Sequence, residues 1–137
     1  MAPMIRVTAS ILLVASFGFS VAYAKSPSEQ EGWTAICKNV TGVHDGDTLT
    51  CVSDTYGTFV VRFAGLDAPE TGQAHWRIAR DRLKELAGRG TVADCYKQDQ
   101  YGRRVCRLRS VGGKDLADAM IGEGLAWHAT RFADEQT

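Results

Sequence analysis

Excess charge of either sign is missing from this 137-residue sequence, in which 16 lysine and arginine residues balance 16 aspartate and glutamate residues. A domain that holds a polyanion through its general surface normally carries a basic balance. The composition therefore excludes binding of nucleic acid by net charge alone. Any affinity for phosphate must come from individual arginines placed at one site.

Long hydrophobic runs are also missing, and the apolar stretch at residues 11–19 is shorter than the ~20 residues that span a bilayer. It follows Arg6 and precedes Ala-Tyr-Ala at 22–24, which is the three-part layout of a secretory signal peptide. We therefore predict a signal peptide at 1–24, and a protein that is secreted or periplasmic without stable membrane association after cleavage. An uncleaved membrane anchor is the alternative.

Zinc-binding patterns are missing as well, because no Cys-x-x-Cys pair occurs and the histidines do not sit at ligand spacing. The four cysteines are Cys37, Cys51, Cys95 and Cys106. An even number in a small exported chain indicates two disulfides, for which three pairings are possible. Proximity in the sequence favours Cys37–Cys51 and Cys95–Cys106, and the other pairings stay open. Each bridge would stabilise the fold by ~3 kcal/mol.

Repeats and low-complexity tracts are absent, and the length allows one domain. We place this domain at residues 33–137, after a polar leader at 25–32. Alternating polar and apolar residues, separated by turn sequences, predict five strands. These are residues 33–43, 48–52, 58–63, 91–96 and 104–109.

The hydrophobic period changes after Pro69 to the spacing of a helix that ends before Gly88. The residues expected on its apolar face are Ala74, Ile78, Leu83 and Leu86. A second, short helix is predicted at 115–122, with Asp115 as its N-cap. Five strands with one helix between the third and fourth and another near the C-terminus are typical of an OB-fold barrel. The predicted fold class is therefore α+β, mainly β.

Three short segments hold nearly all of the residues suited to chemistry: Asp-Gly-Asp-Thr at 45–48, the run from Arg to Glu at 62–70, and Asp-Gln-Tyr-Gly-Arg at 99–103. Each alone is ordinary turn material. Their carboxylates are hard oxygen ligands of the kind that hold Ca²⁺ or Mg²⁺. In an antiparallel meander the first two segments lie at the same edge of the sheet. Arginines, a hard cation and a free carboxylate are the groups that phosphodiester hydrolysis requires.

The same three segments, in this order and at these separations, resemble the signature of staphylococcal-nuclease-like domains. The resemblance spans residues 45–103 and continues more weakly as far as 126. It implies an OB-type barrel and a Ca²⁺-dependent nuclease that acts on DNA, RNA or both. The family usually adds a further long helix beyond the point where this chain ends, so that this helix is expected to be missing here.

The resemblance also implies a role for each acidic residue by position. Asp47 and Asp67 would bind Ca²⁺ together with the main-chain carbonyl of Ala68, and Asp45 would lie in the outer shell of the metal. Glu70 would be the general base, or would hold the attacking water. Ala68 stands where the family often has threonine, which changes little because the expected contact uses the backbone.

The basic and aromatic residues of the motifs would bind the substrate. Arg62 and Arg103 would clamp the scissile phosphate, and Tyr101 would line the nucleotide pocket. Gln100 stands where the family often has a lysine, which removes one positive charge beside the substrate. Trp127 is interpreted as a packing residue, and the three histidines as surface or packing residues.

An OB-fold module that holds single-stranded nucleic acid or another anionic ligand without cutting it is the main alternative. Such a module would not need the acids at 47, 67 and 70 alongside both arginines. A second alternative is an exported structural domain in which these groups form surface salt bridges, but such pairs contribute little to stability. The nuclease interpretation, with the protein acting as a monomer, is therefore preferred.

Overall fold

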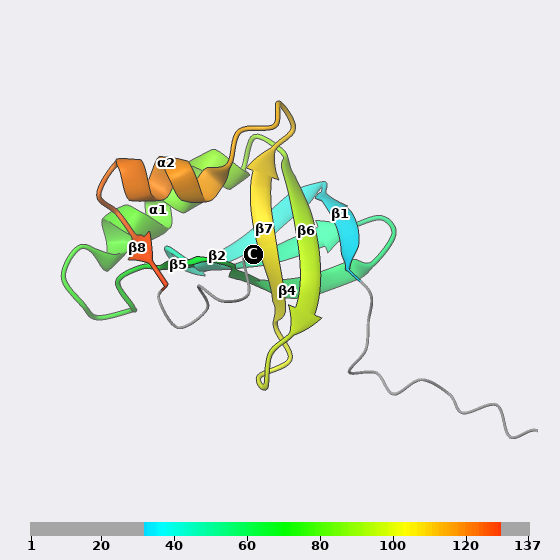
Figure 1. The fold of residues 1–137 in the computed structure, drawn as a ribbon, viewed down its shortest axis with the longest axis horizontal. Coiled ribbons are helices and arrows are strands. Elements are labelled where there is room, and N and C mark those ends of the chain that lie inside the picture. Colours follow the sequence, from blue (N-terminus) through cyan, green and yellow to red (C-terminus); the bar gives the residue numbers. More distant parts are fainter. Residues whose placement is uncertain (1–31, 130–137) are drawn as a thin grey trace, which may run out of the picture.

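The computed structural model describes residues 32–129, which form a curled β-sheet with two helices beside it (Figure 1). The expected signal peptide at 1–24, nearly all of the leader, and residues 130–137 lie outside the described residues. Within the described range, no helix is long and apolar enough to cross a membrane.

Six strands form the main sheet. They are β1 (Trp33–Cys37), β2 (Asn39–Asp45), β3 (Thr48–Ser53), β4 (Gly57–Phe63), β6 (Thr91–Gln98) and β7 (Arg104–Ser110). Their order across the sheet is β1-β6-β7-β4-β3-β2. Neighbouring strands are antiparallel except for β4 and β7, which run parallel. The remaining strands, β5 (Leu66–Asp67) and β8 (Trp127–His128), pair with each other in a separate two-stranded ladder.

The two helices are α1 (Trp76–Ala87) and α2 (Leu116–Gly122), which lie side by side next to the sheet (Figure 1). They occur where the sequence predicts them, and the mainly-β class is confirmed. α2 begins at its predicted N-cap, because the carboxylate of Asp115 accepts a hydrogen bond from the backbone N–H of Ala117 at 2.7 Å. Arg82 of α1 donates two hydrogen bonds of 2.8 Å to Glu123 just after α2, and this pair joins the helices at the surface.

The main sheet has six strands and not the five expected, because the segment 33–43 forms two strands that separate at Lys38, and the short strands β5 and β8 were not expected. β1 pairs with β6 and β2 pairs with β3, so consecutive strands lie at opposite edges of the sheet order. The sheet must therefore curl until its edges approach. The backbone N–H of Lys38 donates to the carbonyl of Val52 in β3 at 2.9 Å. Between the described strands β1 and β2 no ladder forms, and the barrel has an open seam there.

Both disulfides favoured by the sequence are present. Cys37 of β1 is bonded to Cys51 of β3 and so crosses the seam. Cys95 of β6 is bonded to Cys106 of β7, its direct partner in the strand register. All four cysteines are buried in the core. The bridges therefore replace part of the packing that a small barrel with an open seam would otherwise need.

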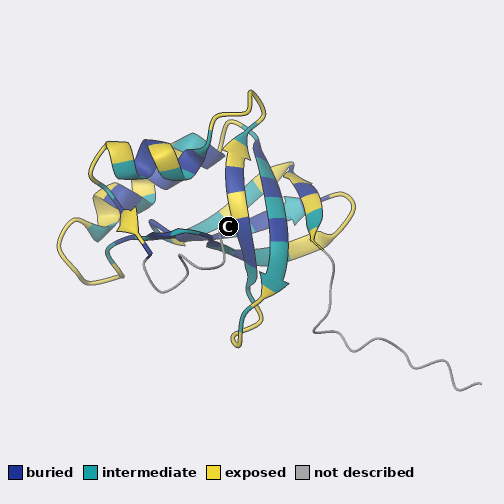
Figure 2. Cartoon of the chain, in the orientation of Figure 1, coloured by how far each residue is buried: buried dark blue, intermediate teal, exposed yellow. Residues whose placement is uncertain are grey.

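α1 packs two alanines and Leu83 fully against the body of the protein, and Leu86, which the sequence also places on this face, packs there partly buried. The buried residues are Ala79, Leu83 and Ala87, at the four-residue spacing of one helix face. The expectation for Ile78 is wrong, since it is 57% exposed, and Ala74 is exposed before the helix begins. Small side chains on the inner face allow the helix to approach closely, which a search for large apolar residues overlooks. Buried and exposed residues alternate along both helices in Figure 2.

Gly46 allows the turn between β2 and β3 to lie against the rest of the molecule. A Cβ at this position would stand 2.6 Å from the Cβ of Ala68 and 2.9 Å from the Cβ of Ala79, which is closer than real side chains come. Its φ is not among the positive values, so the glycine is required for space and not for backbone conformation. The close approach holds Asp45 and Asp47 beside the segment that follows β5.

We expect that replacing either cysteine pair with alanine lowers the free energy of unfolding by about 3 kcal/mol, because each bridge closes a short loop in the unfolded chain. Urea unfolding of the two variants and the unmodified protein under oxidising conditions measures this loss. A variant without any of the four cysteines is the control, and reductant should leave its unfolding midpoint unchanged. Peptide mapping that finds Cys37 bonded to Cys95 or Cys106 would contradict the structure.

Candidate active site

One cleft of about 600 Å³ gathers the residues that the sequence singles out. It is lined by Asp45, Asp47, Arg62, Asp67, Ala68, Glu70, Gln73, Gln100, Tyr101, Arg103 and Trp127. Every residue predicted for metal, phosphate or nucleotide binding is in this set. The three segments 45–48, 62–70 and 99–103, which are far apart along the chain, therefore meet at one place.

Asp47 is the buried centre of the cleft wall. One carboxylate oxygen accepts a hydrogen bond from the backbone N–H of Ala68 at 3.1 Å, and the other accepts one from the hydroxyl of Thr48 at 2.9 Å. Its own carbonyl accepts a bond of 2.8 Å from the backbone N–H of Phe63. Burial raises the pKa of Asp47 above its ordinary value, and the positive charge of Arg62 offsets this only in part.

Arg62 lies near the end of β4, and its guanidinium is held against the turn that follows this strand. Nη1 donates to the carbonyls of Phe63 and Leu66, each at 2.8 Å, and Nη2 donates to the carboxylate of Asp67. Nη1 also stands 3.6 Å from the carboxylate of Asp47. A guanidinium has five N–H donors, so these bonds leave others available for an anion in the cleft.

Asp67 and Trp127 are direct partners in the short ladder between β5 and β8. The ladder therefore fixes the indole of Trp127 beside the carboxylates, although 60 residues separate the two positions in the sequence. Trp127 is 52% exposed, which is unusual for so large an apolar side chain. The expectation that Trp127 only packs against other residues is incomplete, because it also lines the cleft.

Glu70 is exposed at the start of the loop that leads to α1. Its backbone N–H donates to the side-chain oxygen of Gln73 at 2.8 Å, and its carbonyl accepts a bond of 2.9 Å from the backbone N–H of Gln73. These two bonds close a tight turn, which fixes the backbone at Glu70 and leaves its carboxylate at the open side of the cleft. A carboxylate in contact with solvent can hold a water molecule.

Arg103 is positioned by Asp99, a residue to which the sequence analysis gave no role. Nε of Arg103 donates to one carboxylate oxygen of Asp99 at 2.7 Å. The other oxygen accepts from the backbone N–H groups of Tyr101 and Arg103 at 3.0 and 2.9 Å. Burial alone would raise the pKa of Asp99, but these hydrogen bonds outweigh it and hold the pKa below its ordinary value. An aspartate two residues before the tip of a turn is the local signal for this role.

The turn at 99–103 also presents Tyr101, which is 74% exposed. The guanidinium carbon of Arg103 lies 5.4 Å from the centre of the tyrosine ring. Gly102 adopts a φ of 82°, which allows the chain to reverse between these two residues. Tyr101 and Arg103 therefore project as a pair from one rigid turn.

The cleft has the donor chemistry of a hard cation site, since four carboxylates line it and only two guanidinium groups do. Such an excess of carboxylate oxygen fits Ca²⁺ in kind. Among residues 32–129, no group of three or more histidine, cysteine, aspartate or glutamate side chains already stands at metal-binding spacing. Asp47, Asp67 and the carbonyl of Ala68 are the groups that could hold the ion, with Asp45 beside them.

The sequence is similar to proteins described as nucleases. A family model described as "Staphylococcal nuclease homologue" matches residues 60–137. A protein of Shigella flexneri named "Micrococcal nuclease" is 35% identical over 114 residues, which are 77% of this chain and 64% of that protein. A probable staphylococcal-like nuclease of Oryza sativa subsp. japonica is 37% identical over 75 residues, 54% of this chain and 15% of that protein. An uncharacterized endonuclease of Haemophilus influenzae is 27% identical over 96 residues, 70% and 54% of the two chains. This chain thus spans less than two thirds of the length of each of these relatives.

The raised pKa of Asp47 predicts how stability depends on pH. A carboxyl with a higher pKa in the folded state binds more protons there, so its contribution to the free energy of unfolding falls as the pH rises from the ordinary 3.8 through the raised value. Asparagine keeps an acceptor oxygen but cannot ionise. We therefore expect the stability of Asp47→Asn, relative to the unmodified protein, to increase over this interval, as measured by thermal unfolding in chelator.

Asp94 provides a control of opposite sign for this experiment. A hydrogen bond from Arg109, at 2.9 Å, lowers the pKa of Asp94 on the surface of the sheet. Its ionised form therefore stabilises the folded state above the ordinary pKa and loses this effect as the pH falls. Asp94→Asn should lose stability relative to the unmodified protein as the pH rises. If the stabilities of Asp47→Asn and Asp94→Asn, each relative to the unmodified protein, changed in the same direction as the pH rises, the interpretation of Asp47 would be wrong.

Proposed function

This chain belongs to the staphylococcal nuclease family, and on that premise we propose that it is an exported, Ca²⁺-dependent nuclease that hydrolyses phosphodiester bonds of DNA, RNA or both. The observation that carries the proposal is the single cleft that two arginines, four carboxylates and an exposed tyrosine line together. These groups are suited to neutralising a phosphate, holding a hard cation and positioning a water. The proposal includes a secreted or periplasmic location and action as a monomer.

The two arginines would bind the scissile phosphate from two sides of the cleft. Arg62 is fixed by its bonds to the turn after β4, and Arg103 is fixed by Asp99. Because both guanidinium groups are held before substrate arrives, little ordering remains when the phosphate binds. Negative charge grows on the phosphate oxygens in the transition state, and donors that are already aimed at them stabilise it.

The acidic wall of the cleft would hold Ca²⁺ through Asp47, Asp67 and the carbonyl of Ala68, with Asp45 in the outer shell. Bound Ca²⁺ would supply positive charge next to the phosphate, where four carboxylates would otherwise repel it. The contacts of Asp47 with Ala68 and Thr48 keep these donors in place without the ion.

Glu70 would act on the attacking water. Its carboxylate would accept a hydrogen bond and then the proton as the water oxygen forms a bond to phosphorus. The bond from phosphorus to the leaving oxygen breaks in the same displacement, and that oxygen takes a proton from solvent. The exposure of Glu70 at the open side of the cleft supports this role, because water reaches the carboxylate without moving other residues.

A second candidate is a module that binds single-stranded nucleic acid, or another anionic ligand, without cutting it. The two exposed aromatic residues at the cleft, Tyr101 and Trp127, favour it, since strand-binding proteins use such rings as stacking surfaces. The complete set of acids beside both arginines favours cleavage. The two candidates differ in one observable, which is whether a bound strand is cut.

We expect the exported protein to cleave labelled single-stranded DNA or RNA in Ca²⁺ and to lose this activity in chelator. Glu70→Gln should lower the turnover number by about 10²- to 10⁴-fold, which is the range for removal of a general base. Initial rates from gel assays under oxidising conditions measure both effects.

Glu85→Gln is the matched control, because Glu85 is an exposed glutamate of α1 that lies outside the cleft. It should cleave at the rate of the unmodified protein. Equal rates for Glu70→Gln and Glu85→Gln would remove Glu70 from the mechanism. Tight binding of the strand without cleavage in any divalent cation would favour the second candidate.

Asp99 is expected to act through Arg103, and a double-mutant cycle tests this. Asp99→Ala should lower kcat/KM by about 10-fold, because it frees the guanidinium that the carboxylate positions. Arg103→Ala should lower it by about 10²- to 10³-fold, as for loss of a transition-state donor. The double variant should be no worse than Arg103→Ala. Asp94→Ala is the control, because it breaks a comparable surface pair with Arg109, and it should leave kcat/KM unchanged. If the effects of Asp99→Ala and Arg103→Ala multiplied in the double variant, Asp99 would not act through Arg103.

A further inference from the structure

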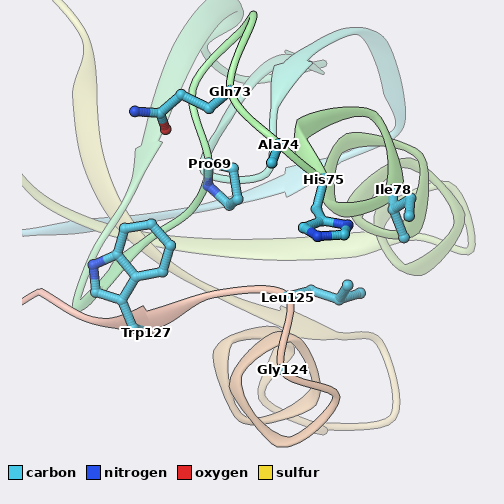
Figure 3. A pocket seen from close by; sticks show the side chains of 8 residues that line it. All are labelled: Pro69, Gln73, Ala74, His75, Ile78, Gly124, Leu125 and Trp127. Atoms are coloured by element: carbon cyan, nitrogen blue, oxygen red, sulfur yellow. The ribbon is translucent and has the colours of Figure 1, made fainter.

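A second cavity of about 680 Å³ opens next to the cleft, between the loop before α1 and the segment that follows α2. Pro69, His75 and Ile78 line one side, and Leu125 and Trp127 line the other. Figure 3 shows the indole of Trp127 and the imidazole of His75 bordering the same open space, with Pro69 between them. We refer to it as the Trp127 pocket.

The Trp127 pocket is continuous with the candidate active site. Trp127 and Gln73 line both cavities, and Pro69 directly precedes Glu70. The position of Trp127 is set by a regular ladder, because it is the register partner of Asp67 in β5 and β8. A group that sits in the pocket therefore lies at a fixed place relative to the carboxylates of the cleft.

The walls of the Trp127 pocket suit a flat, largely apolar group with polar edges. Trp127 is 52% exposed and Ile78 is 57% exposed, so two large apolar side chains face solvent at this place. Gln73 also lines the pocket, and although its side-chain oxygen accepts from the backbone N–H of Glu70, its amide N–H groups can donate to a polar edge. A nucleobase combines a π-face that stacks on an aromatic ring with hydrogen-bonding edges.

The backbone at His75 is held in an unusual conformation at this pocket. His75 has a φ of 64°, and it is the only residue other than glycine with a positive φ among residues 32–129. It stands at the N-cap of α1, where its side chain makes no capping hydrogen bond. A strained conformation of this kind persists where the surroundings fix it, and it often marks a functional surface. At this position the imidazole of His75 lines the pocket.

A third cavity, of about 320 Å³, adjoins the cleft through other residues. It shares Arg62, Gln100, Tyr101 and Arg103 with the cleft, and none of these residues lines the Trp127 pocket. The cleft that holds the two arginines therefore has one cavity beside Tyr101 and a different one beside Trp127. A phosphodiester bond has the same arrangement, because a nucleoside extends from each side of its phosphate.

We infer that the Trp127 pocket binds the nucleobase of the nucleotide next to the scissile phosphate, on the side away from Tyr101. The inference rests on the proposed function only in placing a phosphodiester in the cleft. The base stacks on the indole of Trp127, and Gln73 contacts its edge. Because a base can enter the pocket only when it is unpaired and unstacked from its own strand, the ligand is a single-stranded segment of DNA or RNA.

The first experiment measures binding without cleavage. The full protein in chelator is titrated with a single-stranded oligothymidine, and tryptophan fluorescence is recorded, with anisotropy of a labelled strand as an independent measure of affinity. Stacking should quench the fluorescence of the unmodified protein. Trp127→Phe should lose most of the quenching and keep most of the affinity, because phenylalanine still stacks. Trp127→Ala should bind about 5- to 150-fold more weakly, the range for loss of one base–aromatic stack.

Trp76→Phe is the matched control for the fluorescence experiment. Trp76 is the neighbour of His75 at the start of α1. The guanidinium carbons of Arg77 and Arg80 lie 5.3 and 4.9 Å from the centre of its ring. Trp76 lines neither the cleft nor the Trp127 pocket. Trp76→Phe should retain the quenching by the strand. Quenching that disappears in Trp76→Phe and persists in Trp127→Phe would overturn the assignment.

The second experiment uses cleavage of a short strand with one scissile linkage, in which an abasic residue replaces the base on one side or the other. In the unmodified protein, an abasic residue on the side that enters the Trp127 pocket should lower kcat/KM by about 5- to 150-fold. In Trp127→Ala the same abasic residue should cause no further loss, since the stack is already missing. The abasic residue on the opposite side should penalise both proteins equally.

The outcomes separate this inference from the proposed nuclease activity. Cleavage that responds identically to both abasic strands in the unmodified protein and in Trp127→Ala would overturn the pocket and leave the nuclease standing. A strand that quenches Trp127 without being cut would support the pocket and overturn the nuclease. If the fluorescence were quenched as the protein concentration rises and did not respond to the strand, the pocket would bind a second copy of the chain. That result would overturn the inference.

Discussion

The buried carboxylate of Asp47 is the interaction on which the rest of the site depends. This carboxylate accepts hydrogen bonds from the backbone N–H of Ala68 and from the hydroxyl of Thr48. The backbone carbonyl of Asp47 accepts another from the backbone N–H of Phe63. The turn after β2, the end of β4 and the segment after β5 are thereby joined at one residue. Gly46 makes this possible, because any side chain there would collide with the neighbouring alanines. A buried polar group of this kind costs free energy unless its partners are present, so it specifies one arrangement of the three segments.

The same arrangement affects the electrostatic free energy of the folded protein. Burial raises the pKa of Asp47, which means that the folded protein resists placing a negative charge there. Two other aspartates and Glu70 line the cleft with only two arginines to balance them. Carboxylates gathered in this way repel one another, and a cation bound among them would offset that repulsion and stabilise the folded protein. The disulfides and the bond of Asp99 to Arg103 hold the surrounding strands and turns in place meanwhile.

Much of the fold and the candidate site follows from local sequence. Turn residues and alternation give the strands, the change of hydrophobic period gives α1, and Asp115 marks the start of α2. Two features do not follow in this way. The separation of the first strand at Lys38 depends on pairing with β6, which lies far along the chain, and no local pattern encodes it. The inner face of α1 includes two fully buried alanines, which a search for large apolar residues misses although small side chains permit close packing.

By itself the sequence determined which residue types are available: acids and arginines in three ordered motifs, four cysteines, and a mainly-β pattern with two helices. Those properties are local, because turns, caps and hydrophobic periods involve residues close together in the chain. Only the tertiary structure decided that Trp127 stands beside Asp67 and borders a second cavity, and that the cleft lies between two different pockets. The physical reason is that a two-residue ladder between positions 60 residues apart forms only after the core has packed, and neither strand has enough length or pattern to signal the pairing on its own.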